Sequence, residues 1–156
     1  MGAKKFVNIA KDNYGVELTE DESERIKRTF WQSYPILNQW CIIERRKCTE
    51  RGYALTLGGR KRYFPDIQQA YCEQINTAVQ GSAADVLLET LIALPSDVSK
   101  YLINTVHDEL VFEVPKSLLT EDFKSSIEAA MIKGVQTISP EYPIRDIAEI
   151  KEVETL

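Results

Sequence analysis

The stretch YLINTVHDELVFEVP, residues 101–115, places a histidine and two adjacent carboxylates between two apolar runs. Both runs are rich in β-branched and aromatic residues and have the length of strands, so the pattern predicts a hairpin that is largely buried in a sheet. His107, Asp108 and Glu109 would form its turn. Tight hairpin turns favour Asn-Gly and other glycine-containing pairs, and neither His-Asp nor Asp-Glu is such a pair. Turn preferences therefore do not account for these three residues.

Asp108 and Glu109 indicate a metal site. Two carboxylates side by side at the end of a buried sheet repel each other and are partly desolvated, so their ionisation is costly unless a cation lies between them. Mg²⁺ meets that need, because it takes oxygen ligands from one or two carboxylates and completes its shell with water and phosphate. The alternative is an ordinary solvated polar turn, since loops are usually polar for no further reason.

The composition is that of a globular protein. Hydrophobic residues make up 44% of the 156 residues, enough to fill one core. There is no apolar run of about 18 residues to span a membrane, and the N-terminal MGAKKF lacks the apolar core of a signal peptide. Cys41, Cys48 and Cys72 have no metal-like spacing and predict reduced thiols. We therefore expect a soluble, cytoplasmic protein.

Charge is distributed unevenly along the chain. The net charge of −5 argues, by itself, against a general nucleic-acid binder. Seven of the 19 basic residues nevertheless fall within positions 45–62: Arg45, Arg46, Lys47, Arg51, Arg60, Lys61 and Arg62. Gly58-Gly59 predicts a hairpin turn, and the basic triplet that follows suits contact with phosphates. An isolated charge run is more often simply a solvated face.

Apolar spacing predicts helices over most of the remaining chain. The expected helices cover residues 3–13, about 20–34, 36–50, 66–94 and 121–135. Thr19 and Glu22 form the capping box that starts the second of them. The apolar stripes at Ile26, Phe30 and Tyr34 and at residues 36–43 are expected to face the core. Residues 144–153 predict a closing strand beside the 101–115 hairpin.

The long helix contains a glycine in its middle. Gly81 costs about 1 kcal/mol relative to alanine at such a position, which suggests a kink or a close approach by another backbone or by nucleic acid. Asn76 and Gln80 lie four residues apart on one face beside it. Their amides could donate to a sugar or a base edge, or they could be ordinary solvated side chains.

Three of these stretches resemble motifs of the family A DNA polymerases, the bacterial polymerase I group. VHDELVFEVP is similar to that family's motif C, QGSAADVLLETLIAL resembles its QGTAAD helix, and GYALTLGGRKRYFPDI resembles its GYVxTxxGRRRYxPD segment. The resemblance implies an α+β fold, with a palm antiparallel sheet, packed helices and a partial, mainly helical fingers region. Residues 1–66 would be the C-terminal part of the fingers with the basic hairpin, and residues 67–156 a palm part with the motif C hairpin.

The resemblance also implies roles for single residues. Asp108 matches the metal-binding palm aspartate, Glu109 matches its acidic neighbour, and His107 matches the histidine that touches the primer end. Gln80 and Asn76 match residues that line the DNA minor groove. Arg60 and Arg62, with Lys61 between them, match the basic hairpin that approaches DNA. The implied cofactor is Mg²⁺ in a two-metal site, the implied partners are primer-template DNA and deoxynucleotide triphosphates, and the implied compartment is a bacterial cytoplasm or that of a virus's host.

The sequence also departs from the family pattern. Cys72 stands where the family has an arginine, four positions before Asn76, and the segment between Pro65 and Asn76 is shorter. Motif A, with its DYSxIE aspartate, is absent, as is the fingers helix RxxxKxxxFxxxYG that holds the incoming nucleotide.

These departures predict that this polypeptide alone is not a working polymerase and that it joins an N-terminal polymerase half carrying motif A. Two other interpretations remain open. One is a non-catalytic DNA-binding remnant, and the other is a single-metal hydrolase built on the two acids.

Overall fold

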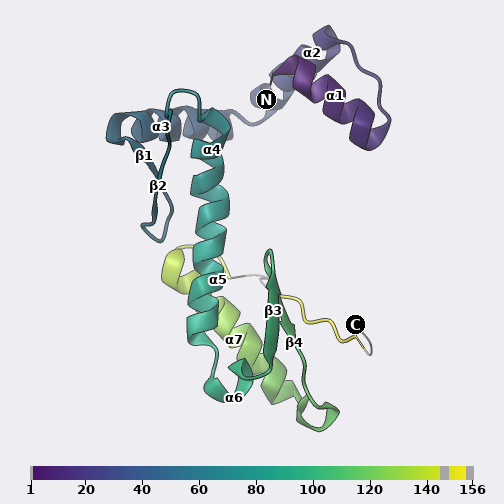
Figure 1. The fold of residues 1–156 in the computed structure, drawn as a ribbon, viewed down its shortest axis with the longest axis vertical. Helices are drawn as coiled ribbons and strands as arrows, with labels where there is room; N and C mark the ends of the chain where they lie inside the picture. Colours follow the sequence, from purple (N-terminus) through teal and green to yellow (C-terminus); the bar gives the residue numbers. More distant parts are fainter. Residues whose placement is uncertain (1, 145–147, 154–156) are drawn as a thin grey trace. The chain divides into compact units, whose positions relative to one another are not determined.

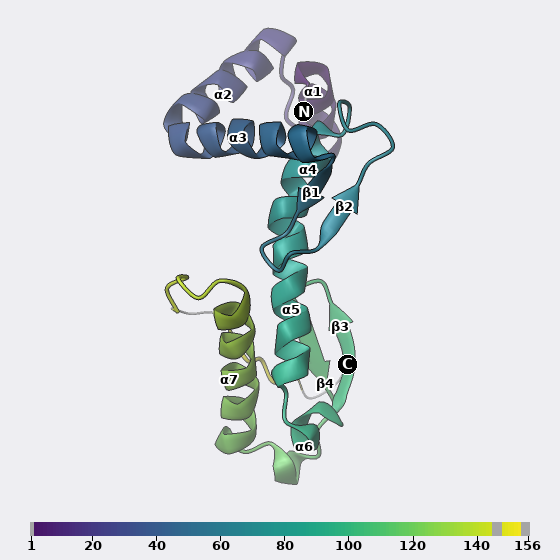
Figure 2. The same cartoon turned by 90° about the vertical axis from the view of Figure 1, so that its left-hand side faces the viewer.

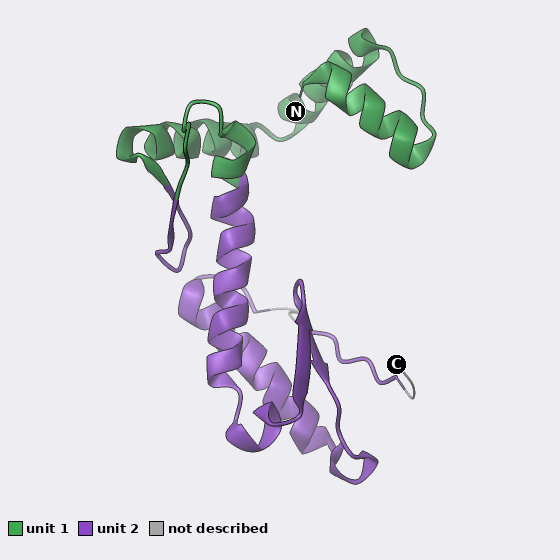
Figure 3. Cartoon of the chain, viewed as in Figure 1, with its two compact units in different colours: residues 1–53, 63–75 green, residues 54–62, 76–156 purple. Residues whose placement is uncertain are grey.

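The computed structural model describes residues 2–144 and 148–153. The chain divides into two compact units, coloured separately in Figure 3. Unit 1 comprises Met1–Tyr53 and Tyr63–Ile75, and unit 2 comprises Ala54–Arg62 and Asn76–Leu156. The described residues form helices and small antiparallel sheets, which confirms the α+β class expected from the sequence.

Unit 1 begins with three helices, α1 (Ala3–Tyr14), α2 (Glu20–Ser33) and α3 (Pro35–Arg51), drawn in purple and blue in Figure 1. Local signals fix their ends. Gly15 and Gly52 adopt positive φ angles of 65° and 82° after α1 and α3, a conformation that glycine reaches without strain. The predicted capping box at Thr19 is present. Pro35 does not kink a helix but starts α3, where its missing N–H costs nothing.

The apolar stripes of α2 and α3 are exposed, contrary to the expectation that they face a core. Ile26, Phe30 and Tyr34 are 42%, 46% and 54% exposed, and Ile36 is 83% exposed. The buried residues of α3 are instead Cys41 and Cys48. Periodicity identifies a face that favours an apolar partner, but it cannot tell whether the described residues supply that partner.

Two short strands, β1 (Tyr53–Leu55) and β2 (Lys61–Tyr63), form the predicted hairpin with the Gly58-Gly59 pair in its loop. Gly59 has a φ of 85°, and the backbone N–H of Thr56 donates 3.0 Å to the carbonyl of Arg60. The hairpin is therefore closed by the glycines that the sequence indicated.

The long helix is composite and starts later than expected. It consists of α4 (Tyr71–Asn76), a π-helical turn η1 (Thr77–Gly81) and α5 (Ser82–Ala93). The predicted start at residue 66 is wrong, because residues 67–69 form a turn and the helix begins only at Tyr71. The Asp66 carboxylate accepts hydrogen bonds from the backbone N–H groups of Gln68 and Gln69 within that turn.

The core of unit 2 lies where α5 packs along α7 (Glu121–Ile138), seen most clearly in Figure 2. Leu94, directly after α5, and Val98 of the following short helix contact Ile127 and Ala130 of α7 there. Short elements α6 (Ser96–Ser99) and η2 (Lys116–Leu118) complete the unit.

The motif C hairpin consists of antiparallel strands β3 (Leu102–Val106) and β4 (Glu109–Phe112). Leu110 and Phe112 pack against the core, but Ile103 and Val106 are 50% and 41% exposed. The expectation of two largely buried strands is wrong for this reason: the described sheet has two strands, and β3 lies mostly uncovered.

The predicted closing strand at residues 144–153 is not seen in its described part. Residue 144 and residues 148–153 form no strand, and residues 145–147 lie outside the described residues. In the parts of the chain that the structure describes, every helix is too short or too polar to cross a lipid bilayer.

Candidate functional site

The acidic turn is tighter than the sequence suggested. Val106 pairs directly with Glu109, so the loop contains only His107 and Asp108, and Glu109 already belongs to β4. His107 has a φ of 56° and is the one non-glycine among the described residues with a positive φ. Positive φ is uncommon outside glycine, and it clusters at functional sites where the surroundings enforce it. The turn thus presents a histidine in a backbone conformation that glycine would adopt more easily.

His107, Asp108 and Glu109 are all exposed. The partial desolvation expected for the two carboxylates is therefore not seen in this chain. The residues that the structure describes hold no group of three or more His, Cys, Asp or Glu side chains suited to a metal ion. As a donor set, two neighbouring carboxylates open to solvent fit Mg²⁺, which favours oxygen ligands and keeps several water molecules.

The residues predicted to bind DNA come together in unit 2. A pocket of about 380 Å³ lies between the β1–β2 loop and η1. Its lining consists of Thr56, Arg60, Lys61, Arg62, Asn76, Thr77, Gln80 and Gly81. We call this pocket the basic groove. It contains all five predicted DNA-binding residues, whereas the acidic turn does not line it.

Gly81 allows the hairpin to approach the helix. A Cβ atom at this position would lie 2.6 Å from Cγ2 of Thr56, far inside van der Waals contact. The backbone also makes a π-helical turn over Thr77–Gly81, and such turns occur frequently at functional sites. Gly81 therefore does have a close neighbour, but in this chain it is the side chain of Thr56 and not another backbone, as the sequence had suggested.

Two residues of the site were not predicted from the sequence. Asp85 is buried on α5 and pairs with Arg60, and Ser82 accepts a hydrogen bond of 2.8 Å from the backbone N–H of Leu57. A signal for Asp85 existed, because it is an acid in a mainly apolar helical segment. Buried carboxylates need a partner, and the basic triplet beginning at Arg60 offered one.

The basic residues of α3 have their own partners in the protein and do not line the basic groove. Arg46 pairs with Glu50 at 3.1 Å, while Lys47 and Arg51 both pair with Glu44. The Arg45 guanidinium lies 4.7 Å from the centre of the Tyr71 ring. The seven basic residues of positions 45–62 therefore divide into a set on α3 with local partners and a set in the basic groove.

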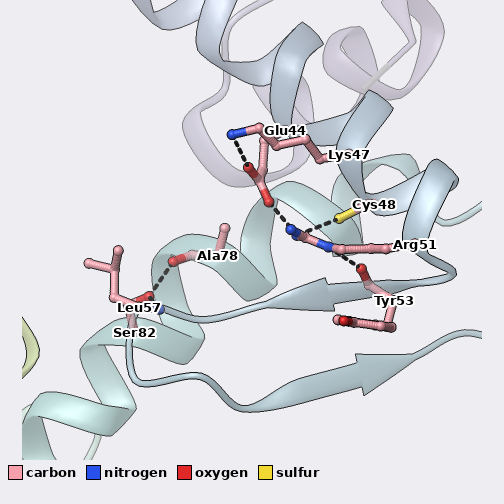
Figure 4. A network of polar contacts seen from close by, with 8 residues as sticks. All are labelled: Glu44, Lys47, Cys48, Arg51, Tyr53, Leu57, Ala78 and Ser82. Atoms are coloured by element: carbon pink, nitrogen blue, oxygen red, sulfur yellow. Dashed lines mark hydrogen bonds and ion pairs between the residues drawn. The ribbon is translucent and has the colours of Figure 1, made fainter.

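Arg51 connects the end of α3 to β1, as Figure 4 shows. It donates to Glu44, to the carbonyl of Tyr53 at 2.9 Å and to the sulfur of Cys48 at 3.7 Å. Burial raises the pKa of the Cys48 thiol, and burial likewise raises the pKa of Cys41. These thiols are packing groups, in keeping with the expectation of reduced cysteines.

Comparison with known proteins identifies the class. The family model for DNA polymerase family A matches residues 8–144, so the chain belongs to the family A DNA polymerases. It is 27% identical over 159 residues to DNA polymerase I of Aquifex aeolicus, covering 97% of this chain and 27% of that protein. It is 32% identical over 143 residues to DNA polymerase I of Streptococcus pneumoniae, covering 83% and 16%. It is also 32% identical over 121 residues to the thermostable DNA polymerase I of Thermus filiformis, covering 70% and 14%.

The chain spans 27% of the length of the Aquifex relative and 14% of that of the Thermus relative. The family resemblance inferred from the three motifs is thus confirmed over most of this chain, for a minor part of the length of those relatives.

Proposed function

We propose that this chain contributes the motif C turn and one wall of the DNA groove to a template-directed DNA polymerase. The observation that carries the proposal is the basic groove, because the three basic and two amide residues predicted from family motifs meet in one pocket of unit 2. Residues 54–62 and 76–81 are separated in the chain, so the fold had to bring them together. Residues 1–66 would belong to the fingers and residues 67–156 to the palm.

Each part of the groove suits a part of DNA. Lys61 and Arg62 supply positive charge, which binds phosphates without regard to sequence. Asn76 and Gln80 supply amides, which can donate to the acceptors of the minor groove or to sugars. The Arg62 guanidinium donates to the Thr77 hydroxyl at 3.2 Å, so the basic and amide sides of the groove are linked.

Asp108 and Glu109 would hold Mg²⁺ at the tip of the β3–β4 hairpin. Bound there, the metal would supply the charge stabilisation that nucleotidyl transfer requires at the attacking and leaving oxygens. His107 precedes the two acids in the same turn, where its ring could hydrogen-bond the primer end. Its positive φ aims the imidazole differently from an ordinary strand residue.

The proposal includes a second carboxylate set from outside these 156 residues, in the same protein or in a partner. A two-metal centre with ions about 4 Å apart needs carboxylates from more than one segment of chain. Asp108 and Glu109 belong to a single segment and supply only one of these sets. The exposed strand residues Ile103 and Val106 support it, because apolar side chains beside a catalytic turn favour a covering strand. Without that segment, we expect the chain to have no polymerase activity.

The test is primer extension with labelled primer-template DNA, deoxynucleotide triphosphates and Mg²⁺. The chain is assayed alone and mixed with a polypeptide that carries motif A and the RxxxKxxxFxxxYG helix. The proposal predicts extension only in the mixture. No extension by the mixture, from components shown to be folded and to associate, would contradict it.

A non-catalytic DNA-binding role is the second candidate. The observation that favours it is that the basic groove is built entirely from this chain, whereas the proposed metal centre is not. It predicts salt-sensitive DNA binding that Asp108→Ala leaves unchanged, and no extension under any condition. Mg²⁺-dependent cleavage of DNA by the chain alone would instead indicate a hydrolase.

A further inference from the structure

Asp85 holds the β1–β2 loop on two sides. The carboxylate is buried on α5, with 5% relative exposure. Its Oδ2 accepts a hydrogen bond of 3.2 Å from the backbone N–H of Gly58, and its Oδ1 pairs with Nε of Arg60. A buried carboxylate is costly unless it is paired and hydrogen-bonded. The loop and α5 therefore satisfy each other.

Ser82 makes a second connection, one helical turn earlier on α5. Its hydroxyl accepts from the Leu57 N–H at 2.8 Å and donates to the Ala78 carbonyl at 2.6 Å, as Figure 4 shows. Ala78 lies in the π-helical turn η1. The same turn carries Gln80, so the hydroxyl links the hairpin backbone to the helical segment that presents an amide to the basic groove.

Arg60 is engaged by contacts within the protein, although its side chain is 53% exposed. Besides its contact with Asp85, its Nη2 donates 2.9 Å to the carbonyl of Gly81. Two of the three guanidinium nitrogens are thus directed at α5 and η1, and the charge is balanced by a buried acid. Lys61 and Arg62 directly follow Arg60 along β2, and both line the basic groove.

We infer that Asp85 is a positioning residue for DNA binding, which it serves by fixing Arg60 and the Gly58 backbone so that Lys61 and Arg62 are held over the groove. Arg60 then acts as a strut between the hairpin and the helix more than as a phosphate ligand. This inference rests on the proposed function, since the placement of the two cations matters only if the groove binds nucleic acid.

The sign of the effect of Asp85→Asn on DNA affinity separates positioning from plain charge. Removing a negative charge beside a basic groove should tighten DNA binding if only the net charge matters. Loss of position should instead weaken the binding of labelled primer-template duplex by roughly tenfold and make its dependence on salt concentration shallower, because fewer phosphates are neutralised. A general loss of stability would lower the melting temperature without changing the salt slope of the folded molecules.

Glu89→Gln is the matched control. It removes the same charge from α5, one turn further on and outside the lining of the basic groove. We expect DNA binding that is unchanged or slightly tighter. Folded Asp85→Asn protein that binds as tightly as Glu89→Gln protein would overturn the inference.

Arg60→Lys keeps the charge but cannot contact Asp85 and the Gly81 carbonyl together as a planar guanidinium does. The inference predicts weaker DNA binding for this variant, so equal affinity would overturn it even if Asp85→Asn failed to fold.

Amide hydrogen exchange gives a readout that does not depend on DNA. Exchange at Gly58 should accelerate in Asp85→Asn and Arg60→Lys but not in Glu89→Gln. An unchanged rate would contradict the proposed hold of Asp85 on the β1–β2 loop. If the unmodified chain bound no DNA while exchange at Gly58 still accelerated in the two variants, the proposed function would fail and the positioning role with it. The contacts of Asp85 with the β1–β2 loop would then remain as structural contacts only.

Discussion

Val106 pairs directly with Glu109 across the β3–β4 hairpin, which confines the turn to His107 and Asp108. The positive φ of His107 follows from this tight register, because two-residue loops need at least one such residue to match the twist of the strands. Of the two proposed metal ligands, Asp108 thus lies in the turn and Glu109 in the last cross-strand pair, directly beside it.

Substitution of His107 should reveal the backbone strain in the turn. Because glycine reaches φ of 56° without a steric penalty, His107→Gly should leave the free energy of unfolding within about 1 kcal/mol of the original or raise it. His107→Val should lower it by roughly 1–2 kcal/mol, since a β-branched residue strongly disfavours positive φ. Denaturant unfolding of both variants checks this. Equal stability of the valine and histidine proteins would show that the turn is not strained.

Gly134 should be required for the packing of α7 against α5. A Cβ added there would lie 2.7 Å from the carbonyl oxygen of Val86 and would also clash with Thr90. Helix propensity alone predicts that Gly134→Ala stabilises the protein by about 1 kcal/mol, whereas overpacking predicts a loss of roughly 1–3 kcal/mol. We expect the loss, measured by thermal or denaturant unfolding. Ala129→Gly, at an exposed position of α7, serves as the control and should cost only the propensity term.

The N-terminus of α2 should show a pH-dependent contribution to stability. Hydrogen bonds from the Thr19 backbone and hydroxyl lower the pKa of the Glu22 carboxyl below its ordinary value of 4.5. A lowered folded-state pKa gives stability that is present above pH 4.5 and is lost as the pH falls through the folded value. Glu22→Ala should therefore be less stable than the original protein at neutral pH, and the difference should shrink in acid. A constant difference in the free energy of unfolding from pH 7 to strong acid would contradict the capping box as its source.

The three thiols should differ in reactivity. Cys72 is exposed, whereas Cys41 and Cys48 are buried and burial raises the pKa of each. Thiolate is the reactive form, so a maleimide at neutral pH should modify Cys72 first and the other two only on unfolding. Peptide mass spectrometry identifies the modified residue. Early modification of Cys48 would show that its contact with Arg51 opens readily.

The sequence predicted the parts of the fold that depend on neighbouring residues. Gly15 and Gly52 ended helices and Thr19 began one, because caps and turns are decided within a few residues. The exception was the start of the long helix, where the Asp66 side chain bonds its own local backbone.

Burial and long-range pairing were harder to predict from the sequence. Ile26 and Ile103 have the pattern of core residues, yet their exposure depends on which partners are present in the described residues. The basic groove was found as a set of residues because the family motifs named them. The pairing of Asp85 with Arg60, 25 positions apart, was not found, since neither helical nor strand periodicity relates such residues.

The rate of a single nucleotide addition by the chain together with a polypeptide carrying motif A tests the central claim most directly. The rate is compared between the original chain, Asp108→Asn, and Asp97→Asn on α6 as the control. The account predicts that Asp108→Asn lowers the rate by roughly a thousandfold or more, since a carboxylate that holds the metal has been removed, while primer-template affinity and the Asp97→Asn rate stay close to the original. A rate for Asp108→Asn near that of the original chain would contradict the assignment of the β3–β4 turn as part of a polymerase centre.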